Sequence, residues 1–206
     1  TSSKKMQSSP TAFFRGCNGV EVGLVQDNSK ADGLGGEVWA GAYLLSSFLN
    51  TEDRAEELLR GRRVLDLGTG TGFVGLSAAA LGASRVLLTD EFPDLASQNV
   101  QVNRATLRRS RVAAKRLIWG EKASPATLEG IQVVLGAEVT YNRKAQGALV
   151  ATLAALLPAL PFEDQRRAVF FLDCDAQGNL CPSSAAFQAL AADAGFDIVE
   201  RHTYTL

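Results

Sequence analysis

From Arg62 onward, short and continuously apolar runs alternate with longer segments whose apolar residues have helical spacing. The apolar runs predict strands at Val64–Leu67, Val86–Thr89, Val112–Leu117, Ile131–Leu135, Val169–Leu172 and Phe196–Tyr204. The segments between them predict helices at Gly72–Leu81, Pro93–Arg104, Lys144–Leu157 and Ser184–Ala194. Strands that alternate with helices favour βαβ units, so the sequence predicts an α/β protein with a mostly parallel sheet.

The N-terminal part of the chain has a different pattern. Residues 13–38 mix short apolar pieces with Gly and Asp, which indicates a small hairpin or an extended lead-in. Helical spacing then continues to Leu49, and a short helix is expected at Glu52–Leu59. We see no linker, so we expect a partly disordered N-terminal extension over residues 1–35 and one domain over residues 36–206.

Composition narrows the possible functions. A chain of 206 residues suits one α/β domain, and its formal net charge of −1 offers no basic footprint for nucleic acid. No apolar run approaches the roughly 18 residues of a membrane span. Cys17, Cys174 and Cys181 are scattered and odd in number, which favours a reducing compartment, the cytoplasm or secondarily the nucleus. His202 is the single histidine, so we expect no metal site and no Ser-His-Asp triad. Separately, we expect the protein to be a monomer.

The most informative motif joins the first strand of the alternating region to its helix. Val-Leu-Asp-Leu-Gly-Thr-Gly-Thr-Gly, residues 64–72, ends a strand in Asp66 and continues into a loop with Gly68, Gly70 and Gly72. Glycines at such a turn let the backbone approach a ligand closely, and the following helix N-terminus adds oriented N–H donors. The motif therefore predicts a site for a nucleotide-like cofactor.

The second strand helps to choose the nucleotide. Asp90 ends that strand, where a carboxylate can accept hydrogen bonds from both ribose hydroxyls of NAD, FAD or S-adenosylmethionine. A G-x-G-x-x-G match at Gly70–Gly75 is a weak signal, and a tight turn with packing glycines and no ligand is the alternative. Asp66 suits a cationic amino-acid moiety better than an anionic pyrophosphate, and no hydride-transfer group stands out. These features favour S-adenosylmethionine.

The chain resembles the seven-β-strand methyltransferases, and among them the protein-lysine branch called methyltransferase family 16. The resemblance extends from about residue 33 to residue 160. Five segments carry it: Gly36–Gly41, Val64–Gly72, Leu88–Asp90 with Asn99 and Asn103, Trp119-Gly120, and Gly136–Tyr141. It implies a Rossmann-like, doubly wound sheet and methyl transfer from S-adenosylmethionine to a nitrogen, expected to be a lysine amine of a protein substrate.

The resemblance also assigns residues. The implied cofactor-binding residues are Trp39, Asp66, Gly68, Gly70, Gly72, Asp90, Trp119 and Glu138. Trp39 would line the pocket, Asp66 would face the methionine part, Asp90 would hold the ribose, and Trp119 would lie beside the adenine.

Glu138 and Tyr141 are the implied catalytic residues. We expect them to orient the incoming amine at the rim of the methyl donor, where desolvation and in-line positioning supply most of the catalysis. The family usually has Asp where this chain has Glu138, so one extra methylene moves the charge. Little sequence remains after Phe196–Tyr204 for a seventh strand.

Several structural alternatives stay open from the sequence. Trp39 and Trp119 can be core aromatics, Tyr141 can merely end its strand, and Asn99 and Asn103 can lie on a solvated helix face. The basic cluster Arg108, Arg109, Arg111, Lys115 and Arg116 is either a solvated surface or a docking site for an acidic protein substrate.

Other functions stay open as well. A small-molecule or protein-histidine methyltransferase uses the same chemistry. A nicotinamide-dependent oxidoreductase and a cofactor-binding scaffold without catalysis belong to other classes.

Overall fold

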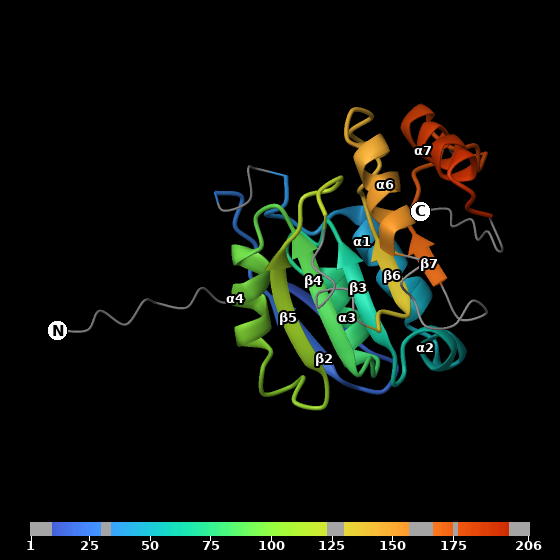
Figure 1. Cartoon of the computed structure of the whole chain (residues 1–206). Coiled ribbons are helices and arrows are strands. Elements are labelled where there is room, and N and C mark those ends of the chain that lie inside the picture. Colours follow the sequence, from blue (N-terminus) through green and yellow to red (C-terminus); the bar gives the residue numbers. More distant parts are fainter. Residues whose placement is uncertain (1–9, 30–33, 123–129, 157–166, 175–176, 198–206) are drawn as a thin grey trace.

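The structure, a computed structural model, describes residues 10–29, 34–122, 130–156, 167–174 and 177–197 (Figure 1). Its strands are β1 (Ala12–Arg15), β2 (Glu21–Leu24), β3 (Arg63–Leu67), β4 (Arg85–Asp90), β5 (Arg111–Arg116), β6 (Val133–Gly136) and β7 (Arg167–Phe170). Its helices are α1 (Ala40–Leu49), α2 (Glu52–Leu58), α3 (Phe73–Ala80), α4 (Asp94–Val102), α6 (Gln146–Leu156) and α7 (Pro182–Asp193). None of these described helices is long and apolar enough to cross a membrane.

Five parallel strands form the main sheet in the order β5-β4-β3-β6-β7. The chain moves outward from β3 to β4 and β5, then returns to the other side of β3 with β6 and β7. This reversal beside β3 is the switch point of a doubly wound Rossmann-like sheet, and it confirms the predicted fold class.

Alternation along the strands divides the interior into two cores. Val64 of β3 and Leu88 of β4 face α3, while Leu65 and Leu87 face the opposite layer with Leu149 of α6. All five side chains are at most 1% exposed, which explains why these strands are apolar on both faces.

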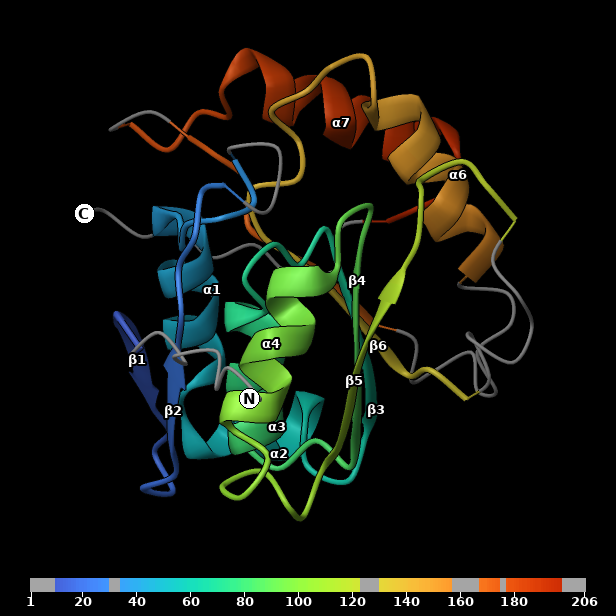
Figure 2. The ribbon, with the colours of Figure 1, turned by 90° about the vertical axis from the view of Figure 1, so that its left-hand side faces the viewer.

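The predicted hairpin is β1 paired antiparallel with β2, and it belongs to the core. Figure 2 shows the hairpin on the left, outside the layer of α1, α3 and α4, with the main sheet on the opposite side of that layer. Phe14 and Leu24 pack into the same cluster as α3. The part of the expected N-terminal extension that forms the hairpin therefore packs as an integral layer of the domain.

Two buried asparagines of the α4 region hold β2. Asn99 accepts a hydrogen bond from the Val25 amide (2.8 Å) and donates to the Val25 carbonyl (2.9 Å) and to the Thr71 carbonyl (2.8 Å). Asn103 makes the same pair of bonds to Gly23, at 3.0 and 2.8 Å. Both side chains are at most 3% exposed, so the solvated-face alternative for them is wrong.

Some predicted boundaries move. β6 begins at Val133 instead of Ile131, and β7 covers Arg167–Phe170 because its register with β6 ends at the Gly136–Phe170 pair. The predicted strand at Phe196–Tyr204 lies almost wholly outside the described residues.

We predict that Asn99→Ala lowers the free energy of unfolding by about 3 kcal/mol. The substitution leaves the buried N–H and C=O of Val25 and the Thr71 carbonyl without their partner, and each unpaired group costs about 1–3 kcal/mol. Urea unfolding measures the change. Gln101→Ala, an exposed amide on the same helix, is the control and should change stability by less than about 0.5 kcal/mol. Equal effects of the two substitutions would contradict the role of Asn99.

Candidate functional site

The carboxyl ends of β3, β4, β5 and β6 meet at one edge of the sheet (Figure 1). The loops that follow them contain most of the residues singled out from the sequence. Ligands of open α/β sheets bind outside the carboxyl ends at the switch point, which here lies between β3 and β6. This edge is the candidate functional site.

The glycine loop after β3 has a left-handed backbone at its glycines. Gly68 and Gly70 adopt φ values of 62° and 52°, which side chains rarely tolerate. A Cβ on Gly68 would lie 2.8 Å from Val139 and 3.0 Å from the Trp119 ring, and one on Gly70 would lie 3.0 Å from the Gly35 carbonyl. The loop is therefore closely covered by three separate segments of the chain.

Asp66 lies beneath this loop and is 2% exposed. Its Oδ2 accepts hydrogen bonds from the Thr69 hydroxyl and from the Gly75 amide at 3.0 Å. Burial raises the pKa of Asp66 to about 7, although both hydrogen bonds favour the charged form. The carboxylate thus connects the end of β3 to the first turn of α3, and its predicted contact with a methionine part stays a prediction.

Asp90 holds the outer side of the loop. Its Oδ2 accepts a hydrogen bond from the Gly70 amide at 2.9 Å, and its Oδ1 accepts one from the Phe92 amide at 3.1 Å. The half-buried carboxylate keeps further lone pairs for donors from solvent or a ligand. The structure therefore brings Asp90 and the glycine loop together, as the sequence predicts.

Trp39 lies at the rim of the site and is 45% exposed. Its ring nitrogen donates to the Leu34 carbonyl at 2.8 Å, and the neighbouring Gly35 covers Gly70. The interpretation of Trp39 as a core aromatic is wrong, because so exposed a ring is not part of the interior. Trp119 is partly buried and packs against the core on the α6 side of the sheet. Its ring also lies beside Gly68, so the same side chain belongs to the core and to the site.

Glu138 follows β6 with a left-handed backbone, φ 57°. Its Oε1 accepts a hydrogen bond from the Gly41 amide in the first turn of α1 at 2.8 Å. Burial raises the pKa of this carboxyl, the Gly41 bond opposes the rise, and the charge of Asp173 adds to it. Glu138 therefore connects β6 to α1 and to the segment that carries Trp39.

Tyr141 projects from the same loop and is 58% exposed. Sequence reasoning missed the residue that fixes this loop, Gln146, which is 1% exposed. Its amide nitrogen donates to the Thr140 carbonyl at 2.6 Å and to the Ser183 carbonyl at 2.8 Å. A glutamine at the first residue of a helix gives no local signal of such a role, because both carbonyls belong to other loops.

Fold and site define a class: Rossmann-like α/β proteins with a glycine-loop site at the switch point. A family model described as lysine methyltransferase matches residues 20–161. The chain belongs to this lysine methyltransferase family.

Curated relatives agree with the family. A protein N-lysine methyltransferase, METTL21A of Danio rerio, is 37% identical over 126 residues, covering 60% of this chain and 56% of that protein. The EEF1A lysine methyltransferase 3 of Mus musculus is 32% identical, with 67% and 57% covered. The chain thus spans little more than half the length of these relatives.

Two solved structures share the fold. Magnesium protoporphyrin IX methyltransferase from Synechocystis, with bound SAH, has a TM-score of 0.54 at 16% identity, covering 77% of this chain and 73% of that one. Fibrillarin from Aeropyrum pernix, with bound S-adenosyl-L-methionine, has a TM-score of 0.53 at 15% identity, with 77% and 65% covered.

We predict that the buried carboxyl of Asp66 makes stability fall as the pH rises. Its folded pKa of about 7 exceeds the ordinary value of 3.8, so the folded chain binds this proton more tightly. The contribution is complete below about pH 4 and is lost as the pH rises through about 7. Since each tenfold change in proton affinity is about 1.4 kcal/mol, the loss is at most about 4 kcal/mol.

Asp66→Asn removes the titration while an amide oxygen still accepts both bonds. Unfolding free energies of the two proteins, measured from pH 5 to pH 8, should therefore diverge in favour of the variant at higher pH. Parallel curves would show that Asp66 does not titrate in this range.

Proposed function

We propose that this chain transfers a methyl group from S-adenosylmethionine to the side-chain amine of a lysine in a protein substrate. One observation carries the proposal. At the carboxyl edge of the sheet, Asp90 at the end of β4 accepts a hydrogen bond from the Gly70 amide of the glycine loop, within a chain of the lysine methyltransferase family.

The residues present fit such a cofactor. Gly68 and Gly70 carry no side chains, so the loop backbone packs closely against Trp119 and Gly35 at the carboxyl edge of the sheet, where ligands of open α/β sheets bind. Each Asp90 oxygen accepts one backbone bond, which leaves acceptor capacity for the two ribose hydroxyls. Trp119 supplies an aromatic surface beside Gly68 for the adenine, and Trp39 supplies a second ring at the rim.

When bound, the cofactor supplies an electrophilic methyl group on a sulfonium. Glu138 would accept N–H bonds from the incoming amine through the oxygen that does not bind Gly41. Tyr141, on the same loop, would close one wall by ring contact with the partly cationic nitrogen. Gln146 fixes the carbonyl of Thr140 between them, so the two side chains keep a defined separation.

The identity of the methyl acceptor, the cellular compartment and the oligomeric state are proposals too. Protein-histidine and small-molecule methylation remain alternatives within the chemistry, and a scaffold without turnover is the alternative outside it. The family match gives no support to a nicotinamide-dependent oxidoreductase. Three free cysteines support a reducing compartment such as the cytoplasm, and we propose a monomer that needs no metal.

We predict that S-adenosylhomocysteine binds with micromolar affinity in calorimetric titration and that NADH does not bind. Asp90→Ala should weaken this binding at least about tenfold, which is about 1.4 kcal/mol. Glu91→Ala removes a neighbouring carboxylate that only faces Arg116 at 3.9 Å, and it should leave the affinity unchanged. Binding of NADH alone would overturn the cofactor assignment.

Glu138 offers a second prediction, because its structural and chemical roles separate. Glu138→Gln keeps an acceptor for the Gly41 amide but loses the charge, whereas Glu138→Ala loses both. Both variants should lower methyl transfer at least about 100-fold, the usual scale for a group that acts on the reacting atoms. Glu138→Gln should also keep cofactor affinity and melting temperature. Labelled-methyl incorporation into lysate protein, with lysine products identified by mass spectrometry, measures transfer, and full activity of the Gln variant would refute the role.

A further inference from the structure

Positive charge is concentrated in one short segment of the chain. Residues 104–116 contain six of its 21 Lys and Arg residues and none of its 22 Asp and Glu residues. They are Arg104, Arg108, Arg109, Arg111, Lys115 and Arg116, and all six are exposed. Because the whole chain has a net charge of −1, the remainder is net acidic.

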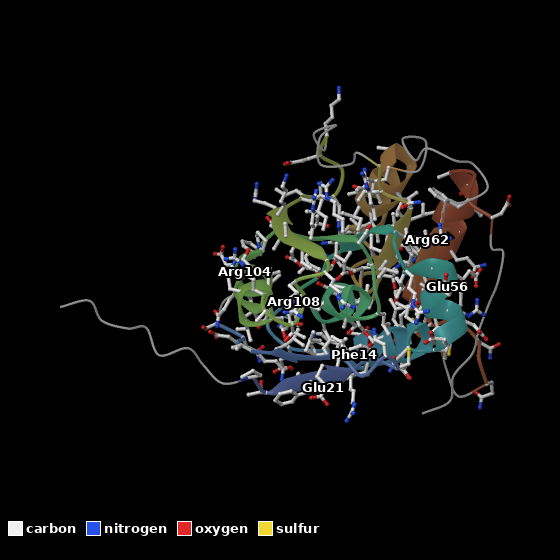
Figure 3. All side chains as sticks on the ribbon, turned by 90° about the horizontal axis from the view of Figure 1, so that it is seen from below. Phe14, Glu21, Glu56, Arg62, Arg104 and Arg108 are labelled. Atoms are coloured by element: carbon white, nitrogen blue, oxygen red, sulfur yellow. The ribbon has the colours of Figure 1, made fainter. Side chains whose placement is uncertain are left out.

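Five of these six cations make no ion pair within the described part of the chain. Among the described residues, only Arg116 makes an ion pair, a long one of 3.9 Å to Glu91. Figure 3 shows Arg104 and Arg108 on the same side of the molecule, near α4. Unpaired like charges repel one another, so their concentration here is unfavourable unless a partner neutralises it.

A hollow lies within this basic segment. Arg104, Arg108 and Arg111 line it together with Leu107 and Ser110. The Ser110 hydroxyl is buried and has no hydrogen-bond partner among the described residues, whereas most buried polar groups do have one. A hollow lined by three arginines and one serine with a spare hydroxyl suits a carboxylate, which accepts charge-assisted hydrogen bonds from guanidinium and hydroxyl donors.

The cations continue from the hollow toward the candidate site. β5 is an edge strand, and its exposed positions include Arg111 and Lys115, about 13 Å apart at the usual rise per residue. Its last residue, Arg116, pairs in register with Asp90. A chain laid along β5 would therefore reach the carboxyl edge of the sheet, where the proposed methyl transfer takes place.

We propose that this basic surface, residues 104–116, docks an acidic segment of the protein substrate, with one carboxylate seated in the hollow. The inference rests on the proposed function for the protein nature of the substrate. Nucleic acid is disfavoured because the segment has no aromatic side chain for base stacking and the rest of the chain is net acidic.

Fluorescence anisotropy tests the proposal directly. The probe is a labelled dodecapeptide of alternating glutamate and glycine, compared with its glutamine–glycine counterpart and with a single-stranded RNA dodecamer. The acidic peptide should bind at low salt, at least about tenfold more tightly than the neutral one, and weaken as salt rises. Tighter binding of RNA, or equal binding of both peptides, would overturn the proposal.

Variants locate the binding surface. Arg108→Gln combined with Arg111→Gln should weaken peptide binding at least about fivefold, or about 1 kcal/mol. Arg15→Gln, an exposed arginine of the hairpin, is the matched control and should change nothing. Ser110→Ala should weaken binding about threefold without lowering the melting temperature, because it only removes an unpaired hydroxyl.

Unchanged affinity in the double variant would refute the surface. The titration needs neither cofactor nor turnover, so this failure is distinct from a failure of S-adenosylhomocysteine to bind.

Discussion

The buried carboxylate of Asp66 is the constraint on which the candidate site depends. It accepts hydrogen bonds from Thr69 within the glycine loop and from Gly75 in the first turn of α3. Those two bonds fix the loop from below, while Asp90 holds it from the other side through the Gly70 amide. A buried carboxylate is costly, and its raised pKa records that cost. Hydrogen bonds to two carboxylates, the buried Asp66 and the half-buried Asp90, therefore hold the loop in its left-handed conformation.

The same loop also secures the N-terminal hairpin. Asn99 binds Val25 after β2 through one acceptor and one donor, and its remaining N–H reaches the Thr71 carbonyl. One amide side chain thus joins α4, the hairpin and the glycine loop in the buried interior. Since the Gly35 carbonyl also covers Gly70, the site is built from segments that lie far apart in the sequence. Displacing the hairpin would therefore disturb the loop as well as the outer layer.

Features of the fold and site that depend on neighbouring residues in the sequence could be predicted, whereas contacts between distant segments could not. The alternation of apolar runs and helical spacing predicts the five described sheet strands, and Asp66, Asp90 and the glycines lie where their motifs place them. The contacts of Asn99 and Gln146 could not be predicted, because their partners are backbone groups of remote segments with no side-chain pattern. The 45% exposure of Trp39 could not be predicted either, because a large aromatic residue next to a helix can lie in the core or at the rim of a site. Periodicity predicts elements, whereas long-range polar contacts require the assembled fold.

The choice of Glu at position 138 has a physical account in this assembled fold. A left-handed backbone favours Asp or Asn over longer side chains, so Glu at φ 57° carries a strain of about 1 kcal/mol or more. Its longer reach brings Oε1 to the Gly41 amide, in the positively polarised first turn of α1. Gly41 is itself restricted there, because a Cβ would lie 2.3 Å from the Phe171 ring and 2.7 Å from that oxygen. The longer side chain of Glu138 therefore occupies the space that the absence of a side chain at Gly41 leaves open. Together, Glu138 and Gly41 fix α1, and with it the exposed ring of Trp39, against the strand end that carries the proposed catalytic carboxylate.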